Sequence, residues 1–224
     1  RGVVAGDSSW GWAVRGGGTK NDVGTSLAVQ KDNLYLYTVG HFEDIARFGT
    51  KTLSSSKDKD VFIAKLDTDG NIIAAESAGG YGVDTASGVC VDPANKYVYF
   101  TGVCYQGAQF GTMTPTMAIA NQPYCFVAKY TTNLSASAVR CIGAPDILNP
   151  NFKAWGLKIR YKDDKIYVQG EYIGKYTGPD GKLTERTTPR RFTATFNPDD
   201  MQRLNIAEGG IDYFDYSKTI DFDS

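Results

Sequence analysis

Three stretches of this 224-residue sequence hold residue types that could bind a metal ion, bind a phosphate or transfer a proton. Asp67-Thr-Asp-Gly-Asn71 has the alternating oxygen ligands with which a calcium-binding loop begins. Gly79-Gly-Tyr-Gly-Val-Asp84 is rich in glycine, as phosphate-binding loops are. His41, which lies beside Glu43 and Asp44, is the only histidine. Each stretch also fits a structural role, and the spacing of the residues decides between the two.

The stretch from Asp67 to Asn71 does not continue as a calcium-binding loop. An EF-hand loop needs a glutamate at its twelfth position, where both carboxylate oxygens bind the ion. Counted from Asp67 that position is Ala78, and an apolar stretch follows Gly70 almost directly. Because glycine adopts the positive φ that tight hairpins need, the stretch predicts a turn between two strands. No metal site is predicted here.

The glycine-rich loop is predicted to be structural as well. It lacks the Gly-x-Gly-x-x-Gly spacing of a dinucleotide-binding loop and the helix that must follow it. The Gly-Gly pair also recurs, at residues 16–17, 79–80 and 209–210. We therefore expect glycines that permit tight crossings between sheets, and aspartates that cap backbone N–H groups beside them. These residues are Gly16, Gly17, Asp22, Gly79, Gly80 and Asp84.

His41 is not predicted to be catalytic. The sequence has no nucleophile elbow that would complete a Ser-His-Asp arrangement with it. One histidine is too few for a common zinc site, and no Cys-x-x-Cys pair occurs. The acidic residues fall in expected turns, and no paired-carboxylate arrangement stands out. The sequence therefore predicts no catalytic residue, no metal and no cofactor.

Charge and hydropathy argue against two classes of partner. The formal net charge is −1, which gives no general electrostatic attraction to nucleic acid. No apolar run approaches the roughly 20 residues with which a helix spans a bilayer. The chain starts at Arg1 without a signal-peptide pattern, and we interpret it as a processed or partial chain.

The elements that must position these residues are short strands, and they recur. Phe126-Val-Ala-Lys-Tyr130 repeats Phe62-Ile-Ala-Lys-Leu66, and Phe110-Gly111 repeats Phe48-Gly49. Apolar residues alternate with period two between turns rich in Gly, Asn and Asp, which is typical of strands. In the first copy a longer connection is expected to carry Phe48-Gly49 and the polar run 54–59.

The length of the repeat points to a β-propeller. A unit of about 62–68 residues with four short strands is typical of a propeller blade, which is a four-stranded antiparallel sheet. The predicted fold class is therefore all-β, one partial β-propeller over residues 1–224, with a stack of sandwich domains as the alternative. The three predicted blades, an additional outer strand and a C-terminal tail are residues 24–78, 86–142, 155–207, 10–15 and 211–224, respectively.

These motifs resemble the SBBP family, the "seven-bladed β-propeller" repeat of secreted and surface proteins. The resemblance covers residues 10–142 well and residues 150–210 weakly. It implies a propeller and an extracellular or cell-surface location, with an organelle lumen as the alternative. It implies no single activity, because propellers host many functions. The matching motifs are Gly79–Asp84, Val89-Cys-Val-Asp92, Tyr97-Val-Tyr-Phe-Thr-Gly102, Phe110-Gly111 and Asp60–Asn71.

Three blades are too few to close a propeller, which typically has about 4–8. Either the chain is part of a longer protein, which we favour, or several chains assemble. Three blades alone would leave two apolar faces in water, and such faces indicate an interface. The predicted partners are therefore other proteins, further copies of the chain or further blades.

The four cysteines leave two alternatives open. A hairpin turning near residues 131–133 would place Cys125 opposite Cys141, and the neighbouring strand end would place Cys104 near Cys125. Cys125 is thus a candidate for a disulfide with Cys104 or with Cys141, and four reduced thiols are the alternative. Cys90 lies between two valines and is expected to be a buried apolar residue.

Aromatic residues near the expected strand ends are the better indication of binding. Aromatic rings stack on sugars or anchor protein interfaces, and the candidates are Tyr81, Tyr105, Tyr172 and Tyr176. Asn133 begins an N-glycosylation sequon in a turn where a glycan has room.

The leading hypothesis is a non-catalytic, secreted or surface-exposed propeller that acts as a structural or protein-interaction module in a larger assembly. The alternative is a lectin-like propeller that binds glycans through its loop aromatics. A propeller hydrolase or lyase is the third hypothesis, and it requires acids or a histidine at the inner ends of the strands near residues 24–30 and 86–91.

Overall fold

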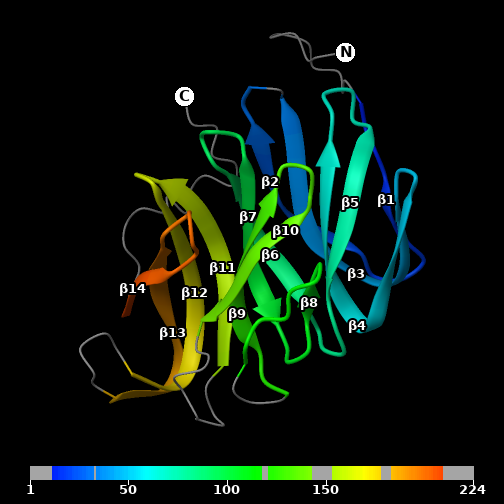
Figure 1. Ribbon diagram of the computed structural model, residues 1–224. Coiled ribbons are helices and arrows are strands. Elements are labelled where there is room, and N and C mark those ends of the chain that lie inside the picture. The colour runs from blue at the N-terminus through cyan, green and yellow to red at the C-terminus, as the bar shows by residue number, and fades with distance from the viewer. Residues whose placement is uncertain (1–11, 33, 118–120, 143–152, 178–182, 209–224) are drawn as a thin grey trace.

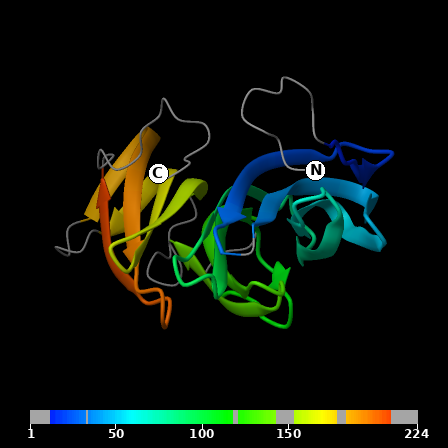
Figure 2. The same ribbon diagram turned by 90° about the horizontal axis from the view of Figure 1, so that it is seen from above.

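The computed structural model describes residues 12–32, 34–117, 121–142, 153–177 and 183–208 (Figure 1). Within these ranges the chain forms strands and turns and no helix. The strands form three antiparallel sheets, which stand side by side in chain order (Figures 1 and 2). The prediction of an all-β chain built from four-stranded antiparallel sheets is confirmed at this level of detail.

The first sheet has four long strands and two short ones attached to it. Its long strands are β2 (Val23–Gln30), β3 (Tyr35–Phe48), β4 (Lys51–Leu66) and β5 (Ile72–Gly79), hydrogen-bonded in that order. Short strand β1 (Gly16–Gly18) pairs with the end of β3, and β8 (Gln109–Phe110) pairs with the end of β5. Because β8 comes from the middle of the second repeat, it ties the first two sheets together.

The second and third sheets have four strands each, in the same chain-order pairing. The second contains β6 (Thr85–Val91), β7 (Tyr97–Cys104), β9 (Tyr124–Thr131) and β10 (Ala136–Ile142). The third contains β11 (Lys153–Lys162), β12 (Lys165–Thr177), β13 (Leu183–Phe196) and β14 (Arg203–Glu208). The strands of the ranges 24–78 and 155–207 each lie in one sheet, whereas the range 86–142 supplies the second sheet and also β8 of the first.

The turn between β4 and β5 uses the residues that resembled a calcium loop. The Asp67 carboxylate accepts hydrogen bonds from the backbone N–H groups of Asp69 and Asn71, at 3.0 and 2.8 Å. Gly70 has φ +83°, as the predicted hairpin requires. A hydrogen bond from the Asn71 side chain lowers the pKa of Asp67. The carboxylate is thus occupied by its own turn.

The connection after residue 42 differs from the expectation, because it is a continuation of two strands. β3 and β4 remain paired as far as Phe48 and Lys51, with a bulge after Glu43. At the bulge Asp44 has φ +64°, which bends the ladder. The sequence did not indicate these strands because the run 54–59 is polar, whereas backbone pairing with β3 needs no apolar side chain.

This hairpin folds back over the outer face of the first sheet. The ring of Phe48 lies 4.5 Å from that of Phe62, centroid to centroid, and a Cβ at Gly49 would contact Ile72. Both Phe48 and Leu53 are buried. The prediction of an exposed apolar face at this end is therefore wrong, because the sheet's own hairpin covers much of that face.

The two contacts between neighbouring sheets are built alike. Lys65 Nζ in the first sheet donates a hydrogen bond to the Thr132 carbonyl in the second, at 3.0 Å. Lys129 Nζ in the second sheet donates to the Pro198 carbonyl in the third, at 2.7 Å. Each ammonium also lies close above a tyrosine ring, at 4.0 and 3.9 Å from the centroid; the rings are those of Tyr35 and Tyr97, respectively.

Tyrosine hydroxyls reinforce the same contacts. Tyr37 Oη donates to the Thr132 carbonyl at 3.1 Å, and Tyr99 Oη donates to the Pro198 carbonyl at 3.4 Å. In each sheet the tyrosine and the lysine are opposite each other in the ladder. A Tyr–Lys pair in one sheet thus binds one carbonyl in the outer turn of the next.

A second recurring contact joins the first strands of the sheets, β2, β6 and β11. Thr25 Oγ1 in β2 donates to the Ala86 carbonyl at 2.7 Å. Ser87 Oγ in β6 donates to the Gly156 carbonyl at 2.6 Å. These strands therefore lie side by side, and a side-chain hydroxyl makes each connection.

The third sheet differs on the face that points away from the second. Aligned Gly–Phe pairs fix the correspondence between sheets: Gly40–Phe62, Gly102–Phe126 and Gly170–Phe192. The next aligned pair is Val39–Ile63 in the first sheet, Thr101–Val127 in the second and Gln169–Thr193 in the third. At the lysine position the third sheet has Thr195, opposite Tyr167. This face is polar where the other two sheets pack against a neighbour, but Gln169 and Thr193 are themselves buried, at 1% and 2% exposed, so the second expected exposed apolar face is also absent.

The predicted outer strand at residues 10–15 is wrong where the structure describes it, since residues 12–15 form no strand. Trp12 Nε1 donates instead to the Thr68 carbonyl at 2.8 Å, in the turn between β4 and β5. The short strand β1 begins only at Gly16. Alternation shows that a segment can pair but not which strand edge accepts it. The predicted tail, 211–224, lies outside the described residues.

Candidate functional site

The loop that crosses from β5 to β6 is fixed by one buried aspartate, Asp84. Its Oδ2 accepts a hydrogen bond from Gly80 N and its Oδ1 accepts one from Tyr105 N, both at 2.8 Å. Its own N–H donates to the Lys59 carbonyl at 2.7 Å. Gly79 has φ +150°, a conformation that favours glycine. Asp84 therefore holds the loop, the end of β7 and β4 together.

The first copy of the repeat has the same arrangement, an aspartate that accepts a hydrogen bond from a glycine N–H, next to β1. Asp22 Oδ2 accepts a hydrogen bond from Gly18 N, four residues before it, as Asp84 does from Gly80. Gly17 has φ +136°. Gly16 lies against the Phe48 ring, where a Cβ would be only 2.7 Å from the nearest ring atom. Both glycine positions thus need a residue without a side chain.

A second buried carboxylate, Asp60, lies beside Asp84. A Cβ at Gly79 would be 2.6 Å from Asp60 Oδ1 and 3.0 Å from Asp84 Oδ2, so both oxygens border the same point. Asp60 Oδ2 accepts a hydrogen bond from Ser56 N at 3.0 Å, whereas Oδ1 is buried without a partner among the described residues. Burial raises the pKa of both carboxyl groups to about 6.

This pair is not apparent from the sequence, because the two aspartates are 24 positions apart and belong to different motifs. One signal was present: the position of Asp60 corresponds to Tyr124 in the second copy. An acid that replaces an aromatic residue of the repeat is an indication of a special environment.

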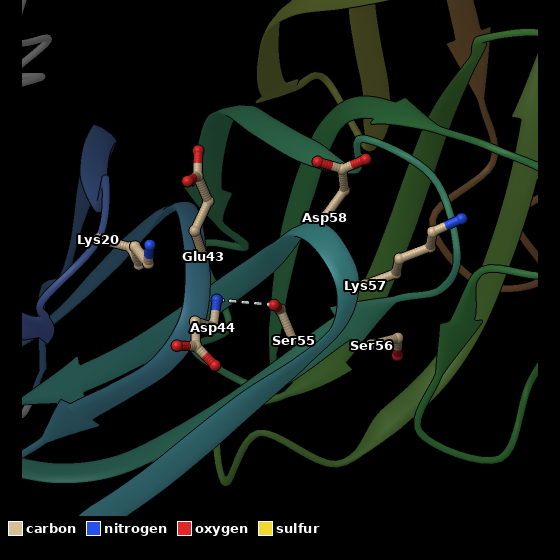
Figure 3. A pocket seen from close by; sticks show the side chains of 7 residues that line it. All are labelled: Lys20, Glu43, Asp44, Ser55, Ser56, Lys57 and Asp58. Atoms are coloured by element: carbon tan, nitrogen blue, oxygen red, sulfur yellow. Dashed lines mark hydrogen bonds between the residues drawn. The ribbon is translucent and has the colours of Figure 1, made fainter.

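A polar hollow of about 330 Å³ opens at the bend of the long hairpin (Figure 3). Asp44 N donates to Ser55 Oγ across it at 2.8 Å. Its walls carry charges of both signs and lack the apolar lining that small-molecule sites usually have. The lining residues are Lys20, Glu43, Asp44, Ser55, Ser56, Lys57 and Asp58.

His41 lies on β3, two residues before Glu43 of the hollow. Burial lowers the pKa of His41, and the neighbouring Lys59 lowers it further, against the opposite effects of Glu43 and Asp22. Lys59 Nζ is 3.5 Å from Glu43 Oε1. His41 Nδ1 is buried, and no described group bonds to it. Of the charged groups around His41, Lys59 and Glu43 are paired with each other on β4 and β3, whereas Asp22 directly precedes β2 and accepts a hydrogen bond from Gly18 N.

The four tyrosine candidates have different surroundings. Tyr81 is 78% exposed at the tip of the crossing loop, and Tyr105 is half-buried behind it. Tyr172 is only 3% exposed and packs against Phe192, so its assignment to a binding surface is wrong. Its ring faces the second sheet because it alternates with Gly170 and Val168 along β12. Tyr176 is in β12, opposite Thr184, and its side chain is outside the described residues.

The disulfide predicted for Cys125 is not formed, and all four cysteines are free. Cys104 is opposite Tyr124 and Cys141 is opposite Phe126, one residue on each side of Cys125. Since neighbouring residues of a strand face opposite ways, Cys125 points away from both. The two other sulfurs lie 3.5 Å apart, which is too long for a disulfide bond. Burial raises the pKa of Cys104.

Two further predicted features can be located. Asn133 of the sequon is exposed in the turn between β9 and β10. Among the described residues, no group of three or more His, Cys, Asp or Glu side chains could hold a metal ion. No helix in that part of the chain is long and apolar enough to cross a membrane.

No protein-family model matches the chain, and no curated protein matches it. The resemblance to the propeller repeat thus rests on the sequence motifs.

Proposed function

We propose that the three sheets are blades of a β-propeller, and that the chain is a non-catalytic structural and protein-interaction module of a larger assembly. The observation that carries the proposal is the recurrence of the inter-sheet contacts. Lys65 and Lys129 bind equivalent carbonyls, those of Thr132 and Pro198, in the next sheet. Equal contacts at successive interfaces mean that one spatial operation relates neighbours, as blades of a propeller require.

Further blades would adjoin the first sheet rather than the third. The Thr68 carbonyl occupies the place that the Thr132 carbonyl has in the second sheet, since each residue lies six positions after the aligned phenylalanine, Phe62 or Phe126. Leu27 is 44% exposed, whereas the corresponding Val89 is 7% exposed because the first sheet covers it. The acceptor side of an inter-blade contact is therefore present at the first sheet. The third sheet lacks the lysine of the donor side.

Internal duplication tests this proposal. A second copy of residues 23–84 is inserted after Asp84, so that the new sheet stands between the first and the second. If one operation relates the sheets, Lys65 of the original sheet meets the Thr68 carbonyl of the inserted one. We expect one cooperative unfolding transition with a larger denaturant m value, because m scales with the surface exposed on unfolding.

The matched control is the same insertion with Lys65→Met in the sheet before it, which should lower the stability of the enlarged stack. An inserted segment that is cleaved by protease while the remainder unfolds as before would contradict the proposal. Mass photometry tests the assembly separately: a stable monomer over the nanomolar range would contradict a need for further blades or copies.

The loop that carries Tyr81 is the surface that we propose for partner binding. An exposed tyrosine on a loop held by three backbone hydrogen bonds is a pre-organised aromatic anchor. The same exposure supports the alternative of glycan binding, because sugars stack on such rings. The proposed location, extracellular or cell-surface with an organelle lumen as the alternative, is supported by the repeat motifs and by the exposed sequon at Asn133.

Tyr81→Ala separates the binding hypotheses. The exposed side chain packs little, so the free energy of unfolding should change by less than about 0.5 kcal/mol. A glycan array probed with the wild type and with this variant then tests sugar binding. Sugar binding that Tyr81→Ala removes would favour the lectin-like alternative. The absence of binding to any sugar would leave the protein-interaction proposal.

A further inference from the structure

We infer that Asp60 and Asp84 share one proton and act as a pH-sensitive latch on the crossing loop that carries Tyr81. The latch does not depend on the proposed function, because it requires only the geometry of the two carboxyl groups.

Asp60 is 3% exposed and Asp84 is 0% exposed, so water does not solvate either carboxylate well. Asp60 Oδ1 has no hydrogen-bond partner in the described part of the chain. A buried acceptor without a donor is costly, and a buried charge without a partner is more so. Asp84 Oδ2 borders the same point beside Gly79, and the Gly80 N–H and the Ser56 hydroxyl, whose hydrogen bonding lowers the pKa of Asp60, face the same carboxyl group.

One proton shared between the two carboxyl groups would supply a donor for the unsatisfied oxygen and remove one of the two buried charges. If Asp60 is protonated at Oδ1, it donates to Asp84 Oδ2, which keeps a second lone pair beside its bond from Gly80 N. The pair then carries one negative charge, and that charge is stabilised by the N–H groups of Gly80 and Tyr105. Two buried carboxylates that border one point cannot both ionise cheaply, as in other carboxylate pairs.

The groups around the pair supply no compensating cation. The pKa of Asp84 is raised by burial and then by the charge of Asp60, and no cation contributes to the pKa of either acid. The other titratable groups that face Asp84 are the Tyr105 phenol and the Cys104 thiol, and both are raised in pKa by burial. The nearest ammonium on β4, that of Lys59, is paired with Glu43.

Loss of the shared proton would act on three segments at once. Asp84 holds Gly80 and Tyr105, and Asp60 holds Ser56 N in the long hairpin. A second negative charge repels the first across Gly79, which separates the hairpin from the crossing loop. The loop that exposes Tyr81 is therefore held in place in mild acid, and it is released when the pH rises further.

The sign of the stability change follows from linkage. An acid whose pKa is raised from 3.8 to about 6 on folding contributes stability that is present below pH 4. That contribution is lost as the pH rises through about 6. His41 acts in the opposite direction, because its pKa is lowered and its contribution is lost as the pH falls. The test is therefore a comparison of wild type with a variant.

Asp60→Asn is the variant, since its amide mimics the protonated acid and donates to Asp84 Oδ2 without a charge. The wild-type Tm should fall by about 5 °C or more between pH 5 and pH 8 relative to Asp60→Asn, in the range that linkage and size scaling give. The control is Asp58→Asn, which removes an exposed carboxylate of the polar hollow and should leave the wild-type profile unchanged.

Carbon-13 NMR of the aspartate carboxyl groups in the wild type gives a second readout. We expect the Asp60 and Asp84 resonances to titrate together, with a step above pH 5. Independent titration of both groups near pH 4 would overturn the inference. Parallel Tm profiles of wild type and Asp60→Asn would overturn it too. Should Asp60→Asn fail to fold, the wild-type titration decides.

Discussion

The two ends of the stack have opposite chemistry on the same backbone. The outer face of the first sheet is an apolar cluster around Phe62, and a bent hairpin from the same sheet covers it with Phe48 and Leu53. The outward face of the third sheet has Gln169 and Thr193 where the other sheets have apolar or small residues. The faces at the two ends are thus both buried but differ in polarity, since Gln169 and Thr193 are 1% and 2% exposed and Phe48 and Leu53 are 4% and 8% exposed.

The comparison also explains why the first end is the better place for another sheet. Phe48 packs on Phe62 in the first sheet as Phe110 packs on Phe126 in the second, at 4.5 and 4.8 Å between ring centroids. In the second sheet this aromatic pair coexists with a neighbouring sheet. The hairpin of the first sheet thus makes the same kind of aromatic contact as the second sheet, and this contact does not exclude a neighbouring sheet.

The largest effect should come from removal of the covering ring. Phe48→Ala deletes a buried aromatic side chain and leaves a cavity, which should cost about 3–5 kcal/mol in the free energy of unfolding. Chemical denaturation measures this cost. Ile45→Ala, in the same hairpin but 57% exposed, is the control and should cost well under half as much. Equal losses would mean that the hairpin does not cover the sheet.

A reciprocal exchange between the two ends should give an intermediate effect. Ile63→Thr places a hydroxyl in the apolar contact between the first two sheets and removes buried carbon atoms, at a cost of about 2–3 kcal/mol. Thr193→Ile changes the aligned position of the third sheet, whose face is polar, and should cost less. Urea denaturation of both variants tests the comparison. A larger loss for Thr193→Ile would contradict the proposed polarity of the third sheet.

The smallest effect should come from the recurring lysines. Lys65→Met and Lys129→Met keep the side-chain length and remove the hydrogen bond and the cation–π contact, at a cost of about 1–2 kcal/mol each. The two losses should agree within about 1 kcal/mol, with the larger loss at Lys129, because Lys129 Nζ has a second acceptor, the Asp199 carbonyl at 3.2 Å. Denaturation curves of the single and double variants check both agreement and additivity. Strongly unequal losses would mean that the interfaces are not equivalent.

Much of the fold could be predicted from local sequence. Alternation, turn residues and the repeated Phe-x-Ala-Lys motif located the long strands of the first two sheets and the turn at Gly70. The hairpin beyond Phe42 could not be predicted in the same way, because its pairing is set by backbone hydrogen bonds along a polar segment. Of the two cysteine alternatives, the four free thiols hold; the disulfide at Cys125 fails by one residue of register, which is enough to turn a strand side chain to the other face.

Part of the candidate site was also visible in the sequence. The Gly-Gly and Asp positions of the crossing loop were found because the motif recurs, and Tyr81 was found as an aromatic residue within it. Tyr172 was misplaced, because sequence alone does not show which face of a long strand is covered. Asp60 was missed, since no local pattern connects it with Asp84.

The sequence by itself determined what each segment could do: which residues alternate, which turns need glycine, and which motif returns in the next copy. Those properties depend on neighbours within a few positions, so they can be predicted from the sequence. Only the tertiary structure decided that Lys65 and Lys129 bind equivalent carbonyls, that one end is covered and the other polar, and that two distant aspartates meet at Gly79. These contacts join residues that are far apart along the chain, and they follow from how the sheets stack.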